Sequence, residues 1–150
     1  MKKIKNTKKT KMVKVKDFDS MTVSQVMEKE VQSVYMKTKG DVIASLMIEG
    51  FGAVPVVEKG FKLAGIVSEH DLLAAVDDGH PLGAVSAKDV MTSNPYSVRP
   101  ETTLGTLVHV LRASDLVRVP VVDAKDKLIG IIARRDVLRT YLATGGKREQ

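Results

Sequence analysis

The sequence of 150 residues contains no cysteine and no tryptophan, and aromatic residues make up only 4% of it. Without cysteine, the chain has neither disulfides nor thiolate ligands for a metal ion. The scarcity of aromatic rings argues against a platform on which single-stranded nucleic-acid bases stack. No apolar run approaches the roughly 18 residues of a membrane span, and no apolar segment typical of a secretory signal follows the charged N-terminus. The composition therefore predicts a cytoplasmic globular protein.

Catalytic and metal-binding patterns are also missing. The three histidines, His70, His80 and His109, do not have the spacing of metal ligands, so we predict no zinc site. No Ser/His/Asp set and no pair of carboxylates converges within the chain, so nothing indicates catalysis. We therefore expect a protein that is not an enzyme.

The formal net charge of +6 is unevenly distributed along the chain. Residues 1–16 contain eight lysines and no acidic residue, which leaves 16 basic against 18 acidic residues in the remainder. The body is thus slightly acidic, and a basic tail precedes it. We interpret this tail as a disordered, solubilising segment, with contact to nucleic acid or an anionic surface as the alternative.

The rest of the chain consists of two copies of one pattern, about 64 residues apart. Four segments of the first copy, 26–27, 33–34, 54–57 and 65–73, return at 90–91, 97–98, 119–122 and 130–138. An in-register repeat indicates a duplicated structural unit that must bury its apolar face against a neighbour, here the other copy. We divide the chain into a tail (1–16), a first repeat (17–80), a second repeat (84–144) and a frayed C-terminus (145–150).

Each repeat is expected to fold as helix–strand–helix–strand–strand–helix. The two opening helices begin with the capping patterns of residues 22–25 and 86–89. Short extended segments follow at 31–35 and 96–98, and amphipathic helices at 42–47 and 104–111. Short connections predict antiparallel hairpins of 53–57 with 63–67 and of 118–122 with 127–132. A last helix carries apolar residues near 72–76 and 137–142. This order predicts an α/β fold with a small three-stranded sheet in each repeat.

Taken together, these motifs resemble those of a known family. The Val-Met pair that ends the first helix, the Val-Pro-Val-Val strand and the Gly-Ile-Val-Ser-Glu-His-Asp turn are similar to a cystathionine-β-synthase (CBS) domain. Two such copies resemble a tandem CBS pair, over roughly residues 20–144. The resemblance implies a stand-alone regulatory module whose two repeats pack with pseudo-two-fold symmetry.

The resemblance also implies a ligand. Paired CBS domains bind adenosine compounds such as AMP, ADP, ATP or S-adenosylmethionine in clefts between the repeats, and no further cofactor is required. By this resemblance Asp71 and Asp136 hold the ribose hydroxyls, and Ser68 contacts ribose or phosphate. Ala133 stands where the second copy needs a hydroxyl, so Arg134 and Arg135 are the candidates for phosphate contacts there. The adenine lies against strand edges at Ser33, Val34, Val54 and Pro55, and at Ser97, Val98, Val119 and Pro120.

A carboxylate that accepts from two vicinal hydroxyls is also the ribose-binding solution of dinucleotide folds. Both aspartates are expected in the first turn of a helix, where the dipole favours phosphate. The same four residues, Ser68 to Asp71, also form a plain helix cap, which is the alternative interpretation. The second copy favours ligand binding, because Asp136 is present although its capping hydroxyl is replaced by Ala133.

Three functions remain open at this level. The first is a homodimeric sensor that reports nucleotide occupancy to an unidentified protein partner, with dimer contacts through the helices beside each sheet. The second is a nucleic-acid or anionic-surface adaptor that acts through the lysine-rich tail. The third is a structural dimer with empty clefts. The sequence leaves open which nucleotide binds, whether one or two sites fill, and how the dimer is oriented.

Overall fold

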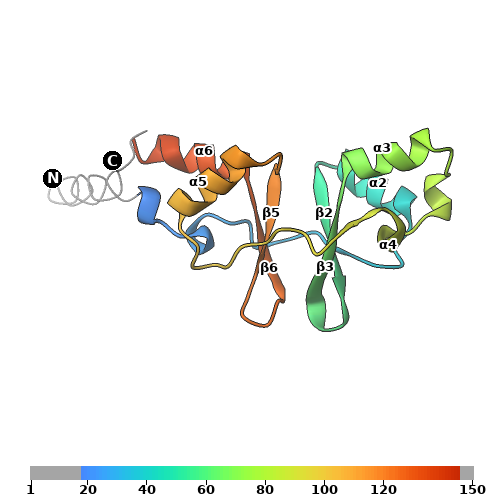
Figure 1. Ribbon diagram of the computed structural model, residues 1–150, viewed down its shortest axis with the longest axis horizontal. Coiled ribbons are helices and arrows are strands. Elements are labelled where there is room, and N and C mark those ends of the chain that lie inside the picture. The colour runs from blue at the N-terminus through green and yellow to red at the C-terminus, as the bar shows by residue number, and fades with distance from the viewer. Residues whose placement is uncertain (1–17, 146–150) are drawn as a thin grey trace, which may run out of the picture. The chain divides into compact units, whose positions relative to one another are not determined.

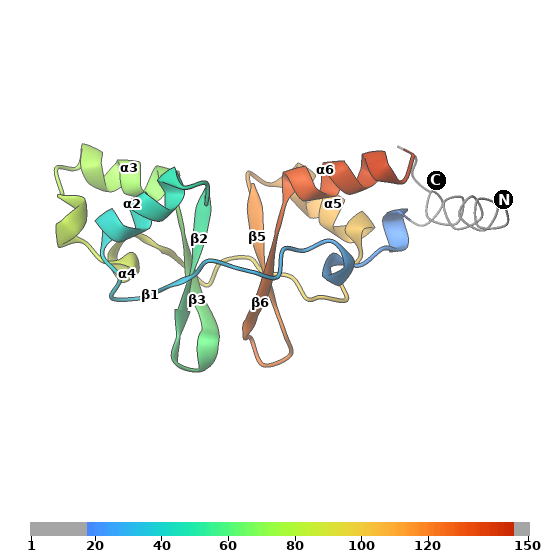
Figure 2. The ribbon, with the colours of Figure 1, turned by 180° about the vertical axis from the view of Figure 1, so that it is seen from behind.

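The structure is a computed structural model that describes residues 18–145 in two compact units (Figures 1 and 2). The central unit comprises residues 29–97 and 122–130, and the terminal unit comprises residues 18–28, 98–121 and 131–145. The lysine-rich tail predicted at 1–16 and most of the predicted C-terminal fray lie outside the described residues. Both units combine helices with strands, which confirms the predicted α/β class.

The sheet of the central unit has the strand order β1-β2-β3-β4. β1 (Val34–Tyr35) runs parallel to β2 (Ala53–Glu58), and β2 forms an antiparallel hairpin with β3 (Lys62–Ser68). This hairpin confirms the prediction from the short connection. The first extended segment is shorter than expected, because only its last two residues pair with β2.

A fourth strand, β4 (Thr92–Ser93), corrects the expectation of a three-stranded sheet. It pairs antiparallel to β3, with Gly65 opposite Ser93. This pair of strands requires glycine at position 65, because a Cβ there would overlap the side chain of Met91 and lie 2.8 Å from the Thr92 carbonyl oxygen. A two-residue strand is too short to show an alternating pattern, so no periodicity predicts it.

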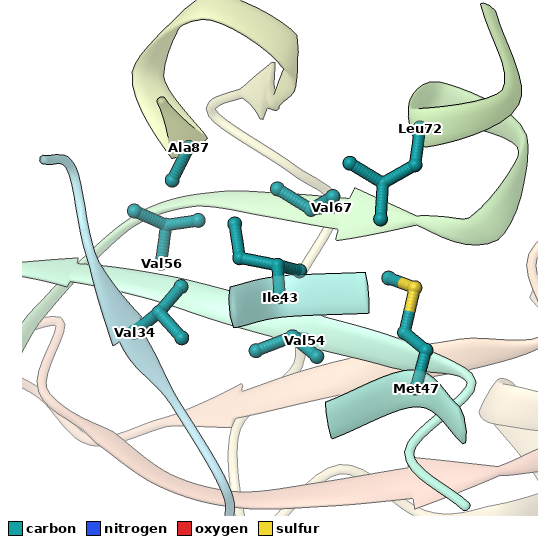
Figure 3. Close-up of a cluster of buried hydrophobic side chains, with 8 residues drawn as sticks. All are labelled: Val34, Ile43, Met47, Val54, Val56, Val67, Leu72 and Ala87. Atoms are coloured by element: carbon teal, nitrogen blue, oxygen red, sulfur yellow. The ribbon is translucent and has the colours of Figure 1, made fainter. Parts of the chain in front are cut away.

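Three helices lie on one side of the β2–β3 hairpin in both views: α2 (Gly40–Ile48), α3 (Glu69–Asp77) and the short α4 (Ala87–Val90) (Figures 1 and 2). Their apolar faces meet the sheet in one cluster of buried side chains, shown in Figure 3. It consists of Val34, Ile43, Met47, Val54, Val56, Val67, Leu72 and Ala87. The predicted helices are thus amphipathic, but the prediction is correct only in part: Ile43 and Met47 are buried, whereas Val42 is 51% exposed.

The terminal unit repeats this plan with α5 (Leu104–Ala113), β5 (Arg118–Val122), β6 (Leu128–Ala133) and α6 (Arg134–Ala143), although Val122 and residues 128–130 of the two strands group with the central unit. β5 and β6 form a two-stranded sheet. The strand predicted at 96–98 is reduced to one parallel bridge, between Val98 and Val121. Among its fully buried side chains are Phe18, Val23, Leu104, Leu107, Val119, Val121 and Ile132.

The compact units differ from the two sequence repeats, because each repeat sends its opening segment into the unit formed by the other repeat's strands. In the terminal unit, the Val23 N–H donates to the Thr102 carbonyl at 2.8 Å. In the central unit, the Ala87 N–H donates to the Thr38 carbonyl at 2.8 Å, and the Ala87 side chain is completely buried. Each core is therefore closed by residues that are distant in sequence.

None of the helices between residues 18 and 145 is long and apolar enough to span a membrane.

Candidate ligand-binding site

The start of α3 holds the two polar residues assigned to the first site. The Ser68 N–H donates to Asp71 Oδ2 at 2.8 Å, and the Asp71 N–H donates to Ser68 Oγ at 3.2 Å. These reciprocal bonds satisfy two backbone groups that a helix N-terminus leaves unpaired. Within the described residues, no hydrogen bond involves the other carboxylate oxygen, Asp71 Oδ1. The capping interpretation is therefore confirmed, and it leaves one acceptor of Asp71 available to a ligand.

The other residues of this first site lie at the same end of the central sheet. Ala53 pairs with Ser68, so the beginning of β2 lies beside the end of β3. Val34 pairs with Val56 in the parallel direction, which places Ser33 at this end as well. The pairing thus gathers the predicted strand residues of the first copy, Ser33, Val34, Val54 and Pro55, near the start of α3.

Their side chains contribute in different ways. Val34 and Val54 point into the core under the helices (Figure 3), so a ligand at this edge would meet their backbone atoms. Pro55 follows Val54 on the strand and therefore faces away from the core helices. Ser33 is half-buried and keeps a hydroxyl at the edge.

The start of α6 repeats the arrangement in the terminal unit with two changes. The Ala133 N–H donates to Asp136 Oδ2 at 2.9 Å, but Ala133 has no hydroxyl to return the bond. The second oxygen, Asp136 Oδ1, accepts a hydrogen bond from Arg139 Nη1 at 3.1 Å. Both oxygens of Asp136 are thus engaged, whereas Asp71 keeps one open.

The two arginines beside Asp136 have different surroundings. Arg134 donates from Nε to the Leu116 carbonyl at 2.6 Å and from Nη2 to the Ser114 carbonyl at 3.2 Å. Its guanidinium therefore holds the loop that follows α5. Arg135 is exposed and makes no side-chain hydrogen bond within residues 18–145. Of the pair, Arg135 has the unengaged charge.

The strand residues predicted for the second site lie mostly in the terminal unit. Val119 and Pro120 belong to β5 and are buried, and the Val98 N–H donates to the Pro120 carbonyl at 3.0 Å. The Arg134 N–H donates to the Val117 carbonyl at 3.0 Å, which brings the start of α6 beside the start of β5. Ser97 is the last residue of its segment in the central unit. The structure therefore brings Val98, Val119 and Pro120 to the start of α6, as it brings the equivalent residues of the first repeat to the start of α3.

A cavity of about 500 Å³ in the central unit is lined by Asp71 and by residues that the sequence analysis did not assign to a site. Asp71 lies in the first turn of α3, Asp78 directly follows its last residue, and Asp89 approaches from α4. Hydrogen bonds from the backbone N–H and then the hydroxyl of Ser86 hold the pKa of Asp89 below its ordinary value, with Lys39 and Lys88 adding to the effect.

The three histidines differ in their surroundings. His70 and His109 are exposed. His80 lies after α3 and lines the cavity. Within residues 18–145, no three His, Asp or Glu side chains are grouped so that they can hold a metal ion.

Comparison with known proteins accounts for both repeats. The CBS domain family matches residues 23–78 and 87–143. The uncharacterized protein MJ0188 of Methanocaldococcus jannaschii is 34% identical over 126 residues, which cover 82% of this chain and 45% of that protein. Inosine-5'-monophosphate dehydrogenase of the same organism is 30% identical over 102 residues, or 68% of this chain and 20% of that enzyme. The chain thus spans less than half the length of these two relatives.

Solved structures agree with this assignment. The CBS-pair protein CBSX2 from Arabidopsis thaliana has a TM-score of 0.77 and 30% identity, over 85% of this chain and 99% of that chain. The structure of CBSX2 in complex with AMP has a TM-score of 0.74 and 34% identity, over 81% of this chain and 96% of that chain. With two matched repeats that cover most of its length, the chain belongs to the CBS domain family.

Proposed function

We propose that this chain is a regulatory module that binds adenosine-containing nucleotides, with AMP, ADP, ATP or S-adenosylmethionine as ligands, and that signals by a change of conformation. The observation that carries the proposal is the carboxylate of Asp71. Ser68 fixes one of its oxygens at the start of α3, and the other oxygen has no partner among the described residues. A relative with 34% identity, CBSX2, has been solved in complex with AMP.

In this proposal, Asp71 accepts hydrogen bonds from the two ribose hydroxyls. The free backbone N–H groups and the positive dipole end of α3 favour a phosphate or another negative group nearby. The strand edge at Ser33, Val34, Val54 and Pro55 receives the adenine. The equivalent set of the second repeat is Ser97, Val98, Val119 and Pro120 with Asp136, while Arg135 supplies charge for a phosphate and Arg134 remains with its loop.

Signalling requires that the ligand bind one conformation of the protein more tightly than another. We propose that the chain forms homodimers and that a partner protein reads this difference. Helix residues support the dimer: Leu73 and Val76 on α3 and Leu138 and Leu142 on α6 are between 54% and 74% exposed, which is high for large apolar side chains. No reaction is assigned to the chain, and no further cofactor is needed for binding.

The direct test is a thermal-shift and calorimetric screen of AMP, ADP, ATP, S-adenosylmethionine, NAD and GTP. A ligand at 100 times its dissociation constant adds about 2.7 kcal/mol to the free energy of unfolding, which is a shift of several degrees. Asp71→Asn and Asp136→Asn serve as matched variants, because asparagine keeps an oxygen for the helix cap and loses the charge.

Stabilisation by an adenosine compound, lost in one of the two variants, is the expected result. A flat response to the whole panel would contradict the proposal. In that case, deletion of residues 1–16 and a salt titration of binding to nucleic acid or anionic vesicles would test the adaptor function. A dimer that also ignores these partners would be the structural dimer with empty clefts.

A further inference from the structure

Arg139 distinguishes the two otherwise equivalent aspartates. It lies three residues after Asp136 on α6, and its Nη1 is 3.1 Å from Asp136 Oδ1. With the repeat offset of 65, the equivalent position after Asp71 is Ala74, which has no donor. The two helix starts therefore have the same backbone arrangement, but only the carboxylate of Asp136 is paired with an arginine.

The surroundings of Asp71 and Asp136 differ in other ways as well. Asp71 also lines a cavity of about 500 Å³, whose other residues, Ala74 among them, come from α3, α4 and the segment between them. The cap of α3 is reciprocal, so Ser68 also restrains the first turn. At α6 the hydroxyl is absent, and the guanidinium of Arg139 must leave the carboxylate, or share it, before ribose hydroxyls can bind there.

We propose that Arg139 makes the two sites unequal, so that an adenosine compound binds first and more tightly at Asp71 than at Asp136. This inference rests on the proposed function. Arg139 acts as a specificity-determining residue: its ion pair competes with the ribose for Asp136 Oδ1 and lowers the negative charge that attracts the hydroxyl donors. The Arg139 side chain is 67% exposed, so its removal leaves no buried cavity.

The test is isothermal titration of the full chain with AMP and with adenosine. In wild type, two sites whose affinities differ about two- to fivefold are expected, the tighter one lost in Asp71→Asn and retained in Asp136→Asn. Arg139→Ala should strengthen the weak site about two- to fivefold, the range that an exposed ion pair accounts for. The reciprocal variant, Ala74→Arg, should weaken the tight site by a similar factor. Arg112→Ala, which removes an exposed arginine of α5, is the charge-matched control and should change neither site.

Several results would overturn the inference while leaving the proposed function in place. One is a tight site that depends on Asp136 rather than Asp71, and another is two sites of equal affinity. A third is weaker binding of AMP, but not of adenosine, in Arg139→Ala, which would show that Arg139 binds the phosphate. Absence of binding by both compounds and by the wider panel would instead overturn the proposed function, and this inference with it.

Discussion

Ser68 and Asp71 hold each other through two hydrogen bonds, one from each backbone N–H to the other's side chain. Ala133, the counterpart of Ser68, has nearly the same backbone conformation, with φ −110° and ψ 157° against φ −105° and ψ 167°. The two helix starts are therefore built for the same cap, and only one of them has both halves of it.

This relationship predicts opposite effects for two exchanges. Ser68→Ala should lower the free energy of unfolding by about 0.5–2 kcal/mol, the usual cost of losing an N-cap hydroxyl. Ala133→Ser should raise it by up to about 1 kcal/mol, because the hydroxyl can accept from the Asp136 N–H. Urea denaturation of both variants measures the two effects. A loss of stability in Ala133→Ser would contradict the equivalence of the two helix starts.

The close pairing of β3 with β4 predicts that Gly65 tolerates no side chain. Gly65→Ala should cost about 1–3 kcal/mol, since the new Cβ meets the Met91 side chain and the Thr92 carbonyl oxygen. Gly83→Ala is the control, because a Cβ there meets only the mobile end of Asp41, at 3.3 Å. The change at Gly83 should stay within about 0.5 kcal/mol. Equal effects of the two substitutions, measured by urea denaturation, would show that β4 does not approach β3 as described.

Two isoleucines of α2 provide a matched pair for the central core. Ile43 is 0% exposed and Ile48 is 86% exposed. Ile43→Ala should lower the free energy of unfolding by about 2–5 kcal/mol, because it removes buried methyl groups and leaves a cavity. Ile48→Ala should change it by no more than about 0.5 kcal/mol. Denaturant titrations below the concentration at which the protein self-associates separate this effect from any dimer contact of Ile48.

The pKa of Asp89 predicts a pH dependence of stability. Hydrogen bonds from Ser86 lower the pKa of this carboxyl in the folded state. The charged form is thus favoured by folding, and its contribution is complete above the unfolded-state pKa and is lost as the pH falls through the folded-state pKa. Asp89→Asn should therefore be less stable than wild type at pH 7, and the difference should shrink below about pH 4. A difference that is independent of pH would contradict this role of the charge.

The local elements could be predicted from the sequence because their signals are local. Apolar spacing placed α2 and α5, and short polar connections placed the β2–β3 and β5–β6 hairpins. The exchange of opening segments could not be predicted in this way. The hydrogen bond from Val23 to Thr102 joins residues 79 positions apart, and no periodic pattern encodes such a pairing.

For the candidate site, the motif supplied Ser68 and Asp71, and the structure brings them together as expected. The pairing of Arg139 with Asp136 has an i, i+3 spacing that a sequence can reveal, but the spacing alone does not show which oxygen is engaged. Asp89 was considered only as part of a cap, and its position beside the cavity depends on the packing of α4 against α3.

The exchange of opening segments also affects the order in which the two units can fold during synthesis. The residues of the central sheet lie between 34 and 93, so that sheet can assemble while the chain is still growing. Residues 18–28 leave the ribosome early, yet their partner Leu104 follows Glu28 by 76 positions, about 4–15 s at 5–20 residues per second. During that interval the apolar side chains of Phe18 and Val23 have no completed core to enter, and transiently exposed apolar surface of this kind is what makes a nascent chain prone to aggregation.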